Sequence, residues 1–132
     1  AAISPQMFAD IVLPELDWQA ERLGCQMYYH TCGYLQHQDL CLSRPYMHVI
    51  QYSRSPKEPC HTPAHLAFFR KVQAAGRCLD LGPSTVADAE FLVRHLRPEG
   101  LFLSIRVATI AEADEILNKA TQWAGTHVHR MP

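Results

Sequence analysis

The sequence lacks an apolar run approaching the roughly 20 residues that a membrane-spanning helix needs. It also lacks a basic start followed by an apolar stretch, which is the pattern of a secretory signal peptide. A basic surplus is missing too, because 12 Lys and Arg residues face 13 Asp and Glu residues, for a net charge of −1. These absences predict a protein that neither enters a membrane nor binds nucleic acid.

Paired cysteine spacing is also absent. The five cysteines are odd in number and scattered, in a chain of 132 residues that is long enough to fold without disulfides, so we expect reduced thiols and a cytoplasmic protein. No glycine-rich phosphate loop and no nucleophile elbow occur. What the sequence does contain is 48% hydrophobic residues, which suits one domain over residues 1–132, and an unusual number of histidines, eight in all.

Helix and strand signals alternate along the chain. Strands are predicted at residues 25–30, 46–52, 77–81 and 101–104. Apolar residues at helical spacing follow each of them. A further helix leads the chain, because Ser4 and Pro5 suit a helix start, and Pro14 predicts a kink in it. Thr85, with Asp88 three residues later, resembles a capping box.

This alternation predicts an α/β fold of four βα units with parallel strands. Two architectures satisfy it: an open doubly wound sheet, and half of a TIM (β/α)8 barrel. In either one, functional groups collect at the carboxyl ends of the strands. We therefore expect the site at residues 30–33, 53–63, 82–84 and 104–108.

His30, Thr31 and Cys32 end the first predicted strand. Side chains alternate along a strand, so this His-X-Cys spacing predicts an imidazole and a thiolate on the same side of the chain. Zinc takes nitrogen and sulfur donors, and a catalytic zinc needs three protein ligands. Cys60 or His61, in the loop after the next strand, is the best local candidate for the third. The competing interpretation is that Cys32 is a small buried hydrophobe.

Other polar residues carry weaker signals. Arg106, just beyond the last strand, is a candidate for binding an anionic substrate, or is a solvated loop residue. Asp80 lies within a strand and either faces the functional end of the sheet or caps a neighbour. His48 is predicted to point into the sheet, whereas His37 and His65 are interpreted as surface residues on helices.

Several segments together resemble one protein superfamily. They are residues 3–8, 12–14, 29–33, 100–104 and 112–117, which read ISPQMF, VLP, YHTCG, GLFLS and EADEIL. This pattern resembles the uroporphyrinogen decarboxylase superfamily, which includes the decarboxylase of haem synthesis and the cobalamin-dependent methyltransferases that pass methyl groups to thiols. The similarity runs through most of residues 3–124, and its most specific parts are the opening segment and the His-Thr-Cys-Gly piece.

The family fold is an eight-stranded (β/α) barrel of well over twice this length, so the resemblance implies that this chain is its carboxyl-terminal half. Half a barrel exposes the inner face of its sheet. The implied partner is therefore the missing amino-terminal half or a second copy of the chain.

The resemblance also implies site residues. In the methyltransferase branch the His-X-Cys pair supplies two zinc ligands, which here are His30 and Cys32. The third ligand in that branch is a cysteine after the last barrel strand. Residues 103–107 of this chain contain no cysteine, so Cys60, or alternatively His61, is expected to complete the set.

The expected function is therefore that of a zinc-dependent corrinoid:thiol methyltransferase. Zinc would activate a thiol, which attacks the methyl group of a corrinoid. One alternative is a metal-free protein that resembles the porphyrinogen decarboxylase. Another is a non-catalytic half barrel that binds a ligand or partner. The ligands that these alternatives imply are a corrinoid protein or a tetrapyrrole.

Overall fold

The computed structural model describes residues 3–32, 36–53 and 63–125. Its helices are α1 (Pro5–Met7), the π-helical turn η1 (Phe8–Val12), α2 (Leu13–Leu23), α3 (Gln38–Leu42), α4 (Pro63–Ala74), α5 (Val86–His95) and α6 (Ile110–Gly125). Its strands are β1 (Met27–Cys32), β2 (Met47–Ser53), β3 (Cys78–Ser84) and β4 (Leu101–Ile105). Among these described residues, no helix is long and apolar enough to cross a membrane.

The leading helix begins as its sequence predicts. The Met7 N–H donates to Ser4 Oγ at 3.1 Å, and Pro5 occupies the first turn, where its missing N–H costs nothing. The irregularity expected near Pro14 takes the form of the π-helical turn η1, which immediately precedes α2. Proline cannot donate the hydrogen bond of a regular helix, and a wider turn before it accommodates that loss.

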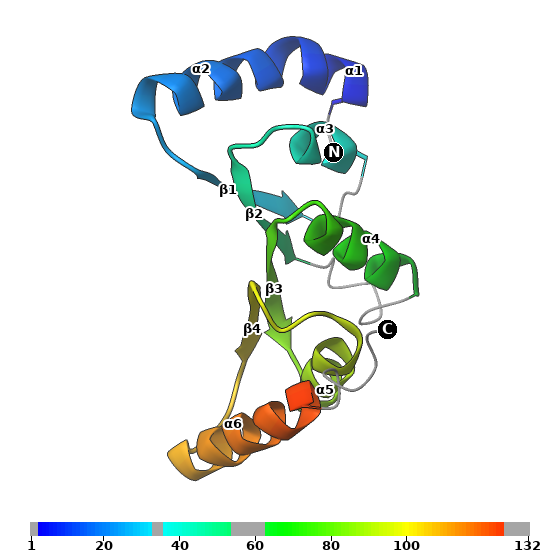
Figure 1. Cartoon of the computed structure of the whole chain (residues 1–132), viewed down its shortest axis with the longest axis vertical. Coiled ribbons are helices and arrows are strands. Elements are labelled where there is room, and N and C mark those ends of the chain that lie inside the picture. Colours follow the sequence, from blue (N-terminus) through cyan, green and yellow to red (C-terminus); the bar gives the residue numbers. More distant parts are fainter. Residues whose placement is uncertain (1–2, 33–35, 54–62, 126–132) are drawn as a thin grey trace.

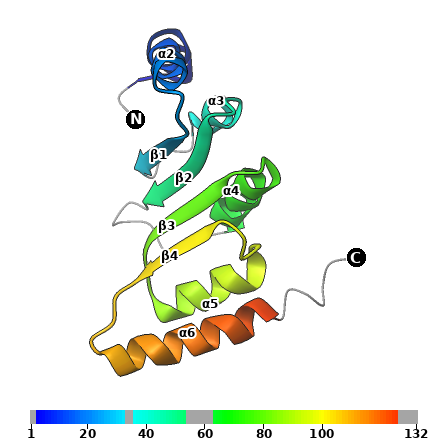
Figure 2. The same ribbon diagram turned by 60° about the vertical axis from the view of Figure 1, so that its left-hand side comes forward.

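The four strands form one parallel sheet in the order β1-β2-β3-β4, which confirms the predicted α/β fold. Figure 1 places α3, α4 and α5 on one side of the strands, with α2 at the β1 end of the molecule and α6 at the β4 end. The turned view in Figure 2 shows the strands succeeding one another from α2 toward α5 and α6. A doubly wound sheet carries helices on both faces, so this arrangement is consistent with a half barrel instead.

Alternation along the strands separates two faces of the sheet. The covered face packs against the helices, and its central side chains, Ile50, Tyr52, Leu79 and Leu81, are at most 3% exposed. Phe69 and Val72 of α4 and Leu92 of α5 press on this face and are fully buried. Trp123 of α6 extends the packing over β4 with Ala89 and Val93. These apolar contacts hold the helices on the sheet.

The opposite face, called the open face here, carries Tyr28, His30, Gln51, Asp80, Phe102 and Ser104. No described helix packs against it, and the Tyr28 and Phe102 side chains remain 52% and 57% exposed. In a closed barrel this face would be the interior. The open face is therefore where a functional site is expected.

Strand ends differ by a few residues from the predicted ones. The first strand is 27–32 instead of 25–30, and the third runs on to Ser84 instead of ending at residue 81. The capping box is present as predicted. The Asp88 N–H donates to Thr85 Oγ1, and the Thr85 N–H donates to Asp88 Oδ2, each at 3.1 Å, so α5 begins where β3 ends.

Candidate functional site

The strand register aligns a polar row across the open face. His30 of β1 pairs with Gln51 of β2, Gln51 with Asp80 of β3, and Asp80 with Phe102 of β4. Residues directly opposite one another on neighbouring strands bring their side chains within reach. Tyr28 lies on the same face, two residues before His30. The row therefore places a phenol, an imidazole, an amide and a carboxylate side by side.

Asp80 is the centre of this group. The Tyr28 hydroxyl donates a hydrogen bond to Asp80 Oδ2, and Gln51 Nε2 donates to the same oxygen at 3.3 Å. Partial withdrawal of Tyr28 from water, together with its bond to the Asp80 carboxylate, raises the pKa of the phenol to about 12. Tyr28 consequently stays protonated at neutral pH and keeps donating to the carboxylate.

His30 joins the group through Gln51. Its Nδ1 lies 2.5 Å from Gln51 Oε1, and the imidazole is exposed on the open face. Tyr28, Asp80, Gln51 and His30 thus form one continuous hydrogen-bonded chain, called the open-face network below. Such a network can orient a bound molecule through its donors and acceptors, and its imidazole can bind a metal ion or accept a proton.

The structure describes only some of the predicted zinc ligands. His30 is in place on the open face, and Cys32 ends β1 two residues later, opposite Ser53 in the register. The side chain of Cys32, and Cys60 and His61 altogether, lie outside the described residues. Within the described residues, no three His, Cys, Asp or Glu side chains gather closely enough to hold a metal ion. The described part alone supplies one nitrogen donor, which fits zinc but does not complete a site.

Arg106 follows β4 and is exposed. Because β1 and β4 are the two ends of the strand order, the structure places Arg106 at the opposite edge of the sheet from His30. It does not bring the guanidinium into the open-face network. Arg106 and His30 could contact one substrate only if that substrate spanned the sheet.

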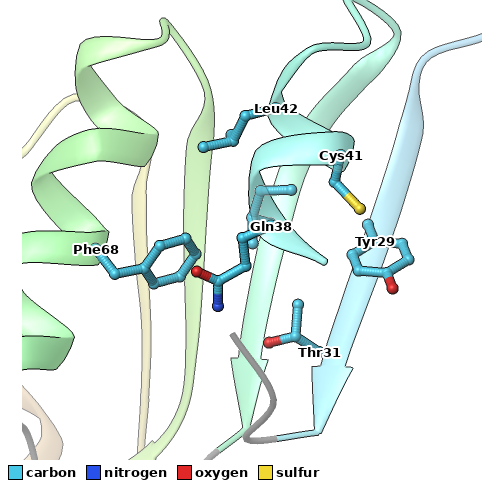
Figure 3. A pocket seen from close by; sticks show the side chains of 7 residues that line it. Tyr29, Thr31, Gln38, Cys41, Leu42 and Phe68 are labelled. Carbon is cyan, nitrogen blue, oxygen red and sulfur yellow. The ribbon is translucent and has the colours of Figure 1, made fainter. Parts of the chain in front are cut away.

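A narrow pocket lies on the other side of the sheet, beneath α3 and α4 (Figure 3). Its lining consists of Tyr29, Thr31, Gln38, Cys41, Leu42, Ile50 and Phe68. Thr31 Oγ1 and Gln38 Nε2 are buried there with no hydrogen-bond partner among the described residues. Burial raises the pKa of the Cys41 thiol to about 11, which keeps it protonated and unreactive at neutral pH. Cys41, Ile50 and Phe68 of this lining belong to the buried hydrophobic cluster, so the pocket is part of the core.

Three histidines lie elsewhere than predicted. His37 and His65, expected at the surface, are 7% and 8% exposed. His37 stacks on Phe8, with ring centroids 4.5 Å apart, and His65 Nε2 lies 2.8 Å from the Tyr52 hydroxyl. His48, expected to point into the sheet, is exposed at the start of β2. Imidazole packs as an aromatic ring once a polar partner satisfies its nitrogen, so a histidine on a helix need not face water.

Sequence reasoning singled out His30 and left two interpretations of Asp80 open, but it missed Tyr28 and Gln51. The only available signal was alternation, which puts Tyr28 on the same face as His30 and Gln51 on the same face as Ser53. Whether these side chains come into contact depends on which strands are neighbours in the sheet and on the register in which they pair. A comparison with known protein families, curated proteins and solved structures finds no match to this chain.

Proposed function

We propose that this chain is the carboxyl-terminal half of a (β/α)8 barrel enzyme of the uroporphyrinogen decarboxylase superfamily, and that its open face forms part of the substrate cavity. The observation that carries the proposal is the open-face network, which joins Tyr28, Asp80, Gln51 and His30 on the side of the sheet that no described helix covers. An enzyme needs such groups where substrate can reach them.

Within the superfamily, we propose the methyltransferase branch, with zinc bound by His30 and Cys32 and by Cys60 or His61. The exposed imidazole of His30 on the open face supports this assignment. When bound, zinc would hold an incoming thiol as its thiolate and so make it a nucleophile toward a corrinoid methyl group. The chain's own residues would hold the imidazole in place through Gln51, and Arg106 would bind an anionic part of the substrate.

The zinc content of the chain, purified under reducing conditions, tests this function. We expect about one zinc ion per chain, and its loss in His30→Ala and in Cys32→Ser. Two variants serve as matched controls, His48→Ala and Cys25→Ser, because both residues are exposed and neither is a proposed ligand; Cys25 precedes β1, and His48 lies at the start of β2. Absence of zinc from the unmodified chain, or full retention in Cys32→Ser, would reject the assignment.

A metal-free, decarboxylase-like function is the second candidate. The carboxylate of Asp80, held on the open face by two donors, favours it, because a carboxylate can accept hydrogen bonds from the pyrrole N–H groups of a porphyrinogen. If this function is correct, the absorbance spectrum of a porphyrin used as a probe should change when the protein is added. The change should disappear in Asp80→Leu and persist in Ser104→Ala. A porphyrin response without zinc would favour this candidate over the methyltransferase.

We further propose that another half barrel completes the molecule, either an amino-terminal half or a second copy. Large apolar side chains exposed at the two ends of the molecule support this, notably Ile11 of η1 and Trp18 of α2 at one end and Ile110 and Leu117 of α6 at the other. Light scattering after size exclusion separates the cases. A mass of twice 15.0 kDa would identify a second copy. A well-folded monomer that binds neither zinc nor porphyrin would favour a non-catalytic half barrel.

A further inference from the structure

Asp80 is a partly buried carboxylate whose charge no described side chain balances. Its two hydrogen-bond donors, the Tyr28 hydroxyl and Gln51 Nε2, are neutral groups, and both meet the same oxygen, Oδ2. Among the described residues, Oδ1 accepts no hydrogen bond, and no ion pair joins Asp80 to a lysine, arginine or histidine. A negative charge left in this state attracts a cation from outside the described part of the chain.

Aromatic side chains border this carboxylate on the open face. Phe102 of β4 is the register partner of Asp80, so the two side chains project from neighbouring points of one face. Tyr28 reaches the carboxylate from β1 through its hydroxyl. Both aromatic side chains are more than half exposed. The face of an aromatic ring attracts positive charge, so the rings and the carboxylate favour the same class of ligand.

The surroundings of Asp80 also discriminate between kinds of cation. A divalent metal ion needs several ligands, and no three His, Cys, Asp or Glu side chains gather in the described part of the chain. A primary ammonium group has three N–H donors, and one open carboxylate oxygen leaves most of them to water. A methylated ammonium group has few or no N–H donors, and its methyl groups present apolar surface to aromatic rings.

We propose that Asp80, Phe102 and Tyr28 form a binding site on the open face for the methylated ammonium group of an organic cation. Asp80 supplies the opposite charge through Oδ1, and the two rings supply apolar contact and attraction to the positive charge. The inference rests on the proposed function only in treating the open face as the surface that substrate reaches. It assigns a charge and a chemical class to that substrate, and it requires no zinc.

Two probes of the same shape test the site. They are choline and neohexyl alcohol, the uncharged isostere in which a carbon replaces the quaternary nitrogen. Binding is followed at low salt by NMR of the chain with 13C-labelled phenylalanine and tyrosine rings, and Phe102→Leu identifies the Phe102 resonance among the five phenylalanines. We expect choline to shift the Phe102 and Tyr28 resonances saturably, with an affinity about 10-fold or more above that of the alcohol. Equal affinities, or no shift at Phe102, would overturn the proposal.

Variants separate the charge of Asp80 from the net charge of the chain. Asp80→Asn should weaken choline binding by about 10-fold or more and leave the alcohol unaffected. The matched control Asp114→Asn makes the same change of charge on an exposed position of α6, and it should leave the choline affinity unchanged. Circular dichroism verifies folding in both. Unchanged choline affinity in Asp80→Asn, or equal weakening in the two variants, would reject the site.

Phe102→Leu tests the contribution of the ring. Leucine keeps the apolar bulk but has no aromatic face, so choline binding, followed at the Tyr28 ring, should weaken by about 2- to 5-fold. The affinity for neohexyl alcohol should not change by a similar factor, because the alcohol carries no charge. Equal weakening for both probes would show that Phe102 provides only apolar contact and would remove the cation–π part of the proposal.

The zinc content of the chain distinguishes this inference from the proposed function. If choline binds at Asp80 and the chain holds no zinc, the zinc-dependent function fails and the ammonium site stands. If the chain holds zinc and choline does not bind, the ammonium site fails and the zinc assignment stands. Each failure is therefore measured by itself.

Discussion

The covered and open faces of the sheet are built from alternate residues of the same strands, yet different interactions hold them together. On β3, Leu79 and Leu81 are 0% and 1% exposed, whereas Asp80 between them faces the other way and takes part in the open-face network. The covered face obtains its stability from close apolar packing. The open face is held by directed hydrogen bonds between side chains that water can reach. Substitutions should therefore affect stability on one face and ligand chemistry on the other.

The largest expected effect contrasts two phenylalanines. Phe69→Ala removes a ring that is 0% exposed against the covered face, and it should cost about 3–5 kcal/mol of unfolding free energy. Phe102→Ala removes a ring that is 57% exposed on the open face, and it should cost less than about 1 kcal/mol. Urea unfolding monitored by circular dichroism measures both. Equal losses would mean that the open face is packed as tightly as the covered one.

Thr31 offers a substitution on the covered face that should raise the stability instead of lowering it. Its hydroxyl is buried in the pocket of Figure 3 without a partner among the described residues, and such a group costs about 1–3 kcal/mol. Thr31→Val keeps the shape and removes the unmatched oxygen, so the stability should rise by about that amount in the same unfolding assay. Thr31→Ser, which keeps the hydroxyl, is the control. A loss of stability in the valine variant would indicate that the hydroxyl has a partner in the folded chain.

Tyr28 provides a titration that belongs to the open face alone. Its pKa is raised to about 12, first by burial and then by Asp80. The folded protein therefore favours the neutral phenol more than the unfolded chain does, and this stabilisation is present below pH 10.0 and lost as the pH rises to about 12. Asp80→Asn should lower the pKa of Tyr28 part of the way toward 10.0, as measured by ultraviolet absorbance of the phenolate.

Tyr46 is the internal control for that titration. Burial and the bond to Asp17 raise the pKa of Tyr46 to about 12 as well, and Asp80 does not contribute to that shift. Asp80→Asn should leave it unchanged. A simultaneous fall in both pKa values would point to a general loosening of the fold.

The smallest expected effect concerns a surface pair that belongs to neither face. Arg44 Nε contacts Asp17 Oδ1 at 2.8 Å, and hydrogen bonds from Arg44 and Tyr46 lower the pKa of Asp17 below 3.8. The contribution of Asp17 to stability is therefore lost as the pH falls below that value. At neutral pH, Asp17→Asn should cost less than about 1 kcal/mol in thermal unfolding, because the pair is partly exposed. A larger loss would mark the pair as an anchor of α2.

The fold was predictable from the sequence because its signals are local. Alternating apolar periodicities and the Thr85–Asp88 capping box act within a few residues, and they place the helices and strands almost where the structure has them. The site was less predictable because it depends on non-local register. Nothing near Gln51 in the sequence indicates that its neighbours across the sheet are His30 and Asp80. The burial of His37 and His65 was missed for the same reason, since their ring partners, Phe8 and Tyr52, come from other elements.

The order of the strands also bears on how the chain is made. Each strand of the sheet pairs with the one synthesised just before it, so no strand has to wait for a distant segment before finding its neighbour. β2 can pair with β1, and β3 with β2, while the rest of the chain is still leaving the ribosome. Each pairing closes only the loop that contains one intervening helix, which keeps the entropy cost of closure modest. The sheet can therefore grow stepwise from its amino-terminal edge, one βα unit at a time.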